Sequence, residues 1–77
     1  MNNSKILLAR MINSANNMNQ CIKNSNETEY KKHEEYLNFA AEIATDMGFE
    51  VHVHWQADGQ IGGIQCGKSQ ELAVIYV

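Results

Sequence analysis

The sequence predicts a small α+β domain of two layers, in which a helical hairpin packs on one face of a three-stranded antiparallel meander sheet. Two stretches have apolar residues at every third or fourth position, residues 5–23 and 27–47, and this spacing indicates amphipathic helices. Three extended stretches follow, over residues 49–56, 60–66 and 71–77. Because helices and strands do not alternate along the chain, the order ααβββ favours an antiparallel sheet.

Length, composition and charge exclude several classes of protein. With 77 residues, 44% of them hydrophobic and 19% charged, the chain is expected to fold as one globular domain, residues 1–77. Its net charge is -3 and its six basic residues are scattered, which disfavours a nucleic-acid partner. The longest apolar run, "LAVIYV", is too short to cross a membrane, and the N-terminal segment lacks the apolar core of a signal peptide. We therefore expect a cytoplasmic protein without a membrane partner, in which Cys21 and Cys66 stay reduced.

The first helix, residues 5–23, is expected to begin after Ser4, a residue type that often serves as an N-cap. Its apolar stripe recurs at helical spacing and includes Leu8, Met11, Ala15, Met18 and Ile22.

The second helix, residues 27–47, lies between two capping signals. Asn26 stands three positions before Glu29, as an N-cap acceptor should. Gly48 follows the last apolar position, where a left-handed residue ends a helix and lets Phe49 contact Ala44. The apolar stripe is wider than one contact needs, so we expect this helix to touch both the first helix and the sheet. We assign its aromatic residues to the core, namely Tyr30, Tyr36 and Phe39.

The pair Asp58-Gly59 predicts a two-residue type I′ turn between the first two strands. Counting outward from that turn sets Trp55 opposite Gly62, where a residue without a side chain leaves room for the indole. The next pairs on the same face are Val53 with Ile64 and Val51 with Cys66. We expect this face to be the core face.

For the third strand, a loop over residues 68–70 sets Leu72 against Cys66, Val74 against Ile64 and Tyr76 against Gly62. The opposite face of the sheet then carries an apolar patch on the second and third strands, bordered by the histidines of the first. These predicted interface residues are Ile61, Ala73, Ile75, Val77, His52 and His54. Such a patch, next to an edge strand that lacks charges or proline, indicates a protein partner or a second copy of the chain.

The histidines also suggest a metal site. His52 and His54 lie on one side of a strand about 6.6 Å apart, two rises of about 3.3 Å, with Glu50 as a third candidate ligand. The alternative is that they form the polar face of a strand. His33 falls in the apolar stripe of the second helix, where an imidazole is usually structural. Gly62-Gly63 leads into a strand rather than a helix, so it does not resemble a phosphate-binding loop, and no cofactor is expected.

We predict a small non-enzymatic protein-interaction module, a homodimeric inhibitor or adaptor of the kind that phages and other mobile elements encode. It would bind a protein partner through the second face and free edge of its sheet. Two alternatives remain from other classes: a metal-responsive protein that uses His52 and His54, and an enzyme whose site is shared across a dimer.

Overall fold

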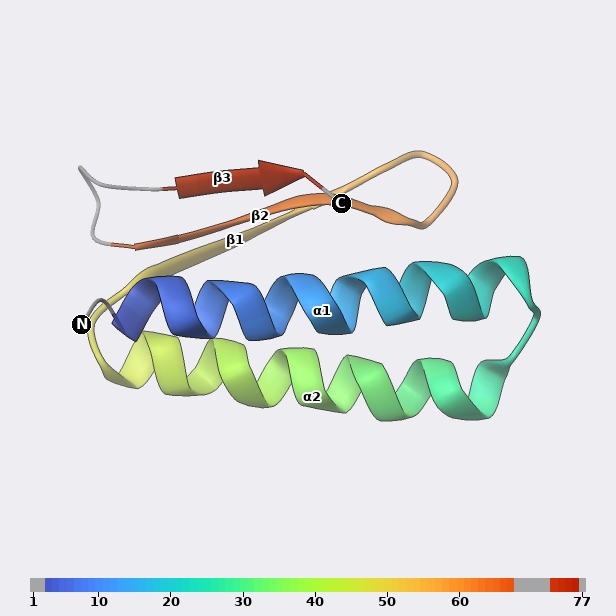
Figure 1. Cartoon of the computed structure of the whole chain (residues 1–77), viewed down its shortest axis with the longest axis horizontal. Coiled ribbons are helices and arrows are strands. Elements are labelled where there is room, and N and C mark those ends of the chain that lie inside the picture. The colour runs from blue at the N-terminus through green and yellow to red at the C-terminus, as the bar shows by residue number, and fades with distance from the viewer. Residues whose placement is uncertain (1–2, 68–72, 77) are drawn as a thin grey trace.

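The computed structural model shows two long antiparallel helices followed by an antiparallel β-hairpin and a further short strand (Figure 1). It describes the backbone of residues 3–67 and 73–76, and the side chains of residues 5–67. The elements of this part are α1 (Asn3–Lys23), α2 (Glu27–Asp46), β1 (Glu50–Trp55), β2 (Ile61–Gly67) and β3 (Ala73–Tyr76). The predicted α+β class and the antiparallel pairing of the first two strands are confirmed.

The ends of α2 are capped as predicted. The Asn26 side chain accepts a hydrogen bond from the Glu29 N–H at 3.2 Å, which satisfies one of the free donors of the first turn. At the other end Gly48 adopts a φ of +87°, and its N–H donates to the Thr45 carbonyl. The Phe49 N–H donates to the Ala44 carbonyl at 3.0 Å, which completes the Schellman arrangement.

The start of α1 differs from the prediction. The helix already includes Asn3, so Ser4 lies inside the first turn and is not the N-cap. Its end at Lys23 is followed by Ser25, which has a φ of 55° and turns the chain into α2.

The core lies where α1 meets α2 on one side and β2 on the other. In Figure 1, α1 runs between α2 and the sheet. Residues less than a tenth exposed come from all three elements and form one apolar cluster, which includes Leu8, Met11, Ala15, Met18, Leu37, Ala40, Ala44, Ile61, Ile64 and Cys66. Because α1 covers the central strand, α2 contacts the sheet along β1.

The hairpin between β1 and β2 has a different turn from the predicted one. Gln56 pairs with Gln60 through a 2.7 Å bond from the Gln56 N–H to the Gln60 carbonyl, which leaves a three-residue loop, residues 57–59. Only Gly59 in this loop has a positive φ, +87°. The Asp58 carboxylate accepts from the Gln60 N–H at 2.9 Å and holds the loop. The predicted type I′ turn is therefore wrong, since that turn needs positive φ at both central residues.

One extra residue in the loop is balanced by one extra residue in β2. Next to the loop Trp55 pairs with Ile61, but His54 pairs with Gly63, so a β-bulge leaves Gly62 without a partner on β1. Beyond the bulge the predicted pairs Val53 with Ile64 and Val51 with Cys66 are confirmed.

The bulge reverses the face of Ile61 and changes the neighbours of Trp55. Ile61 was expected on the second face, but it is 1% exposed and belongs to the core. Trp55 was expected in the core opposite Gly62, but it pairs with Ile61 and is 55% exposed. A Cβ at Gly62 would meet the Gln56 side chain, not the indole.

β3 pairs with β2 one residue away from the predicted register. Ile75 lies opposite Ile64, Val74 opposite Gln65 and Ala73 opposite Cys66, whereas Val74 was expected opposite Ile64. The predicted interface positions Ala73 and Ile75 depended on the other register, and their side chains lie outside the described residues. Val77 and the predicted loop over residues 68–70 lie outside the described residues.

Candidate functional site

The largest exposed apolar side chains of the helical layer lie on its outer surface, away from the sheet. Phe39 is 65% exposed and Tyr36 is 52% exposed, and both line a hollow of about 340 Å³ between the two helices. Ile43 lies in the same hollow on α2, while α1 contributes Leu7 and Arg10. We call these five residues the aromatic face.

The geometry of α2 explains why these aromatics are not in the core. Leu37, Ala40 and Ala44 are buried on the stripe that packs against α1. At about 100° per residue, Phe39 points away from that stripe and shares its side of the helix with Glu35, one turn earlier. The assignment of Tyr36 and Phe39 to the core was wrong, and the signal that could have corrected it is this charged neighbour.

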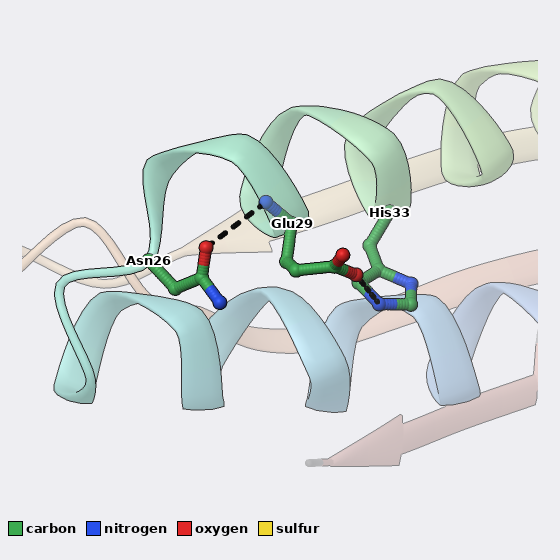
Figure 2. A network of polar contacts seen from close by, with 3 residues as sticks. All are labelled: Asn26, Glu29 and His33. Atoms are coloured by element: carbon green, nitrogen blue, oxygen red, sulfur yellow. Dashed lines mark hydrogen bonds and ion pairs between the residues drawn. The ribbon is translucent and has the colours of Figure 1, made fainter.

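A short chain of polar contacts along α2 leads to the aromatic face. Figure 2 shows Asn26, Glu29 and His33, with the Glu29 side chain between the other two. A Glu29 carboxylate oxygen lies 3.7 Å from His33 Nε2, and the His33 ring makes an edge contact with Tyr36, their centroids 5.8 Å apart at an interplanar angle of 72°. Edge contacts between rings favour one orientation. His33 therefore orients Tyr36 at the border of the aromatic face, in keeping with a structural role.

A second hollow, about 600 Å³, separates α2 from β1. We call it the α2/β1 groove. Val51 and Val53 form its strand side, where both are half-buried although they pair with fully buried residues of β2. The helix side consists of Asn38, Ala41, Glu42, Thr45 and Asp46. The groove exists because α1, not α2, covers the middle of the sheet.

The second face of the sheet is polar where its side chains are described. Glu50, His52 and His54 are exposed, and Gln65 is half-buried beside them. His54 Nε2 lies at hydrogen-bond distance, 3.0 Å, from the Gln65 amide oxygen, while His52 Nε2 is 3.8 Å from a Glu50 carboxylate oxygen. The two imidazoles thus have separate partners. No group of three or more potential metal ligands comes together among the residues that the structure describes.

Asn19 is a positioning residue that no local sequence pattern predicted. Its side-chain amide accepts a hydrogen bond from the Ile61 N–H at 2.9 Å and donates one to the Ile61 carbonyl at 3.0 Å. Ile61 neighbours the bonded pair of Gln56 and Gln60, so by the alternation of an antiparallel ladder its main-chain groups point away from β1. The last described pair of β2 with β3 is Gly63 with Tyr76, two residues beyond Ile61. Asn19 therefore takes the place of a strand partner and fixes the hairpin to α1.

Both cysteine side chains of the chain are buried. Cys21 and Cys66 are free thiols, 9% and 1% exposed. Burial raises the pKa of the Cys66 thiol above its ordinary value, so the thiol is protonated at neutral pH. Cys66 consequently serves as a small apolar core residue.

Comparison with known proteins adds no family to this description. No family model, no curated protein and no solved structure matches the chain. Neither helix of the described part is long and apolar enough to cross a membrane.

Proposed function

We propose that the chain is a small non-enzymatic protein-interaction module, an inhibitor or adaptor, that forms a homodimer through its aromatic face. The observation that carries this proposal is the exposure of Phe39 and Tyr36 beside an apolar hollow. An exposed aromatic cluster surrounded by polar residues is typical of protein–protein interfaces, and aromatic side chains contribute much of the binding free energy there.

Two further features favour a second copy of the chain as the occupant. No carboxylate is among the described residues that line the hollow, so the acidic residues behind the net charge of -3 do not face one another when two copies meet there. A domain of 77 residues has a small core, and burial between two copies adds stability to it. A twofold axis through the aromatic face would bury the same residues of both copies.

The proposed interface lies on the helices, whereas the sequence predicted it on the second face of the sheet. Ile61 is in the core, and the described side chains of the second face are polar. The three-stranded meander remains part of the proposal as the scaffold beneath the helices, supported by the pairing of β3 with β2.

Analytical ultracentrifugation of the wild-type chain and of Phe39→Glu tests the dimer. We expect the wild type to sediment with twice the mass of one chain, and Phe39→Glu to weaken association by roughly 100-fold, because it places a charge in the buried centre of the interface. Phe39 is mostly exposed, so the substitution leaves the fold intact, which circular dichroism checks.

Ile22→Glu is the matched control. Ile22 is another exposed apolar residue, 37% exposed, near the C-terminal end of α1 and outside the aromatic face. It should leave the dimer unchanged. A wild type that stays monomeric at high micromolar concentration, or a Phe39→Glu chain that associates like the wild type, would show that the aromatic face is not a dimer interface.

A further inference from the structure

The α2/β1 groove exposes apolar surface that belongs to the core face of the sheet. Val51 and Val53 pair with Cys66 and Ile64, which are 1% and 0% exposed, yet the valines themselves are only half-buried. On β2 the core face is covered by α1, but on β1 it faces the groove. An added segment in the groove would complete the cover of the sheet.

The groove also runs along a free strand edge. β1 is the outer strand of the sheet, and within residues 3–67 and 73–76 it pairs with β2 alone. Gln56 hydrogen-bonds toward β2, so by alternation along the strand the main-chain groups of Trp55, Val53 and Val51 point to the outer edge. The strand carries no lysine or proline that would block pairing there. An extended peptide can therefore add to this edge.

The charges around the groove are of one sign. Glu42 and Asp46 line it from α2, one helical turn apart, and its lining includes no basic residue among those that the structure describes. Glu50, at the start of β1, adds a further negative charge on the second face of the sheet. These carboxylates attract a cationic segment and repel a second copy of the same acidic edge.

We propose that the α2/β1 groove binds an extended cationic segment of a partner protein, which adds as a strand to the free edge of β1. Lysine or arginine side chains at alternate positions would place their aliphatic stems on Val51 and Val53. Their charged ends would reach Glu42 and Asp46. The intervening side chains would lie on the other face of the sheet, beside His52 and His54.

The cationic segment is the partner of the interaction module proposed above, so the inference rests on that proposed function. Its test probes the α2/β1 groove, whereas the test of the dimer probes the aromatic face. The probe is a capped eight-residue peptide that alternates lysine and threonine, titrated into the isotope-labelled chain and followed by backbone amide NMR. We expect saturable shifts at β1 and at the C-terminal half of α2. Two matched peptides should not bind: one with glutamate in place of lysine, and one with an N-methyl group on every backbone amide, which leaves no N–H on either edge to pair with a strand.

Variants of the groove measure how much its two carboxylates contribute to peptide binding. The double variant Glu42→Gln, Asp46→Asn should weaken the lysine peptide by about 10-fold or more, since it removes both carboxylates that line the groove. Glu34→Gln with Glu35→Gln, which removes two charges from α2 outside the groove, should leave the affinity within about twofold.

Three results would overturn the inference. The first is that the lysine peptide, at millimolar concentration, does not shift the amide resonances of β1. The second is that the groove variant binds the lysine peptide as tightly as the wild type does. The third is that the N-methylated peptide binds equally well, which would show charge attraction without strand pairing. Phe39→Glu should bind the peptide normally. Loss of the dimer and loss of peptide binding are thus separate results, and each proposal can fail alone.

Discussion

The side-chain amide of Asn19 on α1 makes two hydrogen bonds with one residue of β2, Ile61, at 2.9 and 3.0 Å. We expect Asn19→Ala to lower the free energy of unfolding by about 2 kcal/mol, because it leaves a half-buried N–H and C=O without partners. Urea denaturation measures the change. Asn16→Ala, at an exposed position of the same helix, is the control and should change stability little. Equal midpoints for the two variants would mean that Asn19 does not fix the hairpin.

The N-cap of α2 provides a second prediction. Asn26→Ala removes the acceptor of the Glu29 N–H and should cost about 1 kcal/mol of stability. Asn24→Ala, two residues earlier in the same exposed turn, should cost less, because Asn24 bonds in this turn through its main-chain N–H, which donates to the Gln20 carbonyl at 2.9 Å. Thermal unfolding followed by circular dichroism distinguishes the two. If Asn24→Ala is the more damaging variant, the capping assignment fails.

Gly48 and Gly62 should respond differently to alanine. Gly48 has a φ of +87° and open space around it, so Gly48→Ala costs about 1 kcal/mol through backbone strain alone. At Gly62 a new Cβ would lie 3.2 Å from the end of the flexible Gln56 side chain, which can move. Gly62→Ala should therefore be the milder variant in chemical denaturation. The reverse order would show that the backbone at the bulge, not at the cap, is under constraint.

The buried Cys66 thiol should make the free energy of unfolding depend on pH in the alkaline range. Burial raises its pKa above the ordinary value of 9.0, so the unfolded chain loses the thiol proton at a lower pH than the folded chain. Between those two pKa values the folded state binds more protons, and the free energy of unfolding falls as the pH rises above about 9. The pKa of Tyr30 is raised too, by burial and then by the charge of Glu34, and adds a decline at higher pH.

Cys66→Ala tests this origin of the pH dependence. It should remove the part of the decline that begins nearest pH 9 and keep the part due to Tyr30, in urea denaturation repeated over a series of pH values. The same slope in both chains would assign the decline to other groups.

Local signals in the sequence were sufficient to predict both caps of α2. Asn26 and Gly48 act through bonds to residues within four positions, so their roles depend little on tertiary structure. The central hairpin pairs, Val53 with Ile64 and Val51 with Cys66, were also predictable, because a buried face strongly selects one register.

The end of the hairpin was not predictable in the same way. Asp58-Gly59 fits a two-residue turn, and it equally fits a three-residue loop that ends in a left-handed glycine. The choice depends on Ile61, which gains burial and two bonds from Asn19 when the bulge at Gly62 turns it inward. Those partners are 42 residues apart in sequence, and no local pattern relates them.

The functional surface was misplaced for a related reason. The apolar stripe of α2 is broad, and which part of it is buried depends on how α2 packs against α1. Because α1 covers the sheet, Phe39 and Tyr36 are left on the outer surface, while Val51 and Val53 border a groove. A hydrophobic pattern indicates that a residue needs a partner, but the tertiary arrangement decides whether that partner is in the same chain.

The paired irregularities of the hairpin also affect how this fold can change in length. The added residue of the loop and the added residue of β2 both lie on the loop side of the pair that His54 forms with Gly63. Loss of Gly62 alone would give an uninterrupted ladder, and loss of Ala57 alone would give a two-residue turn before the same bulge. Neither loss changes the pairs from His54 to Glu50, so insertions and deletions at this end of the sheet should be accommodated there while Ile64 and Cys66 stay in the core.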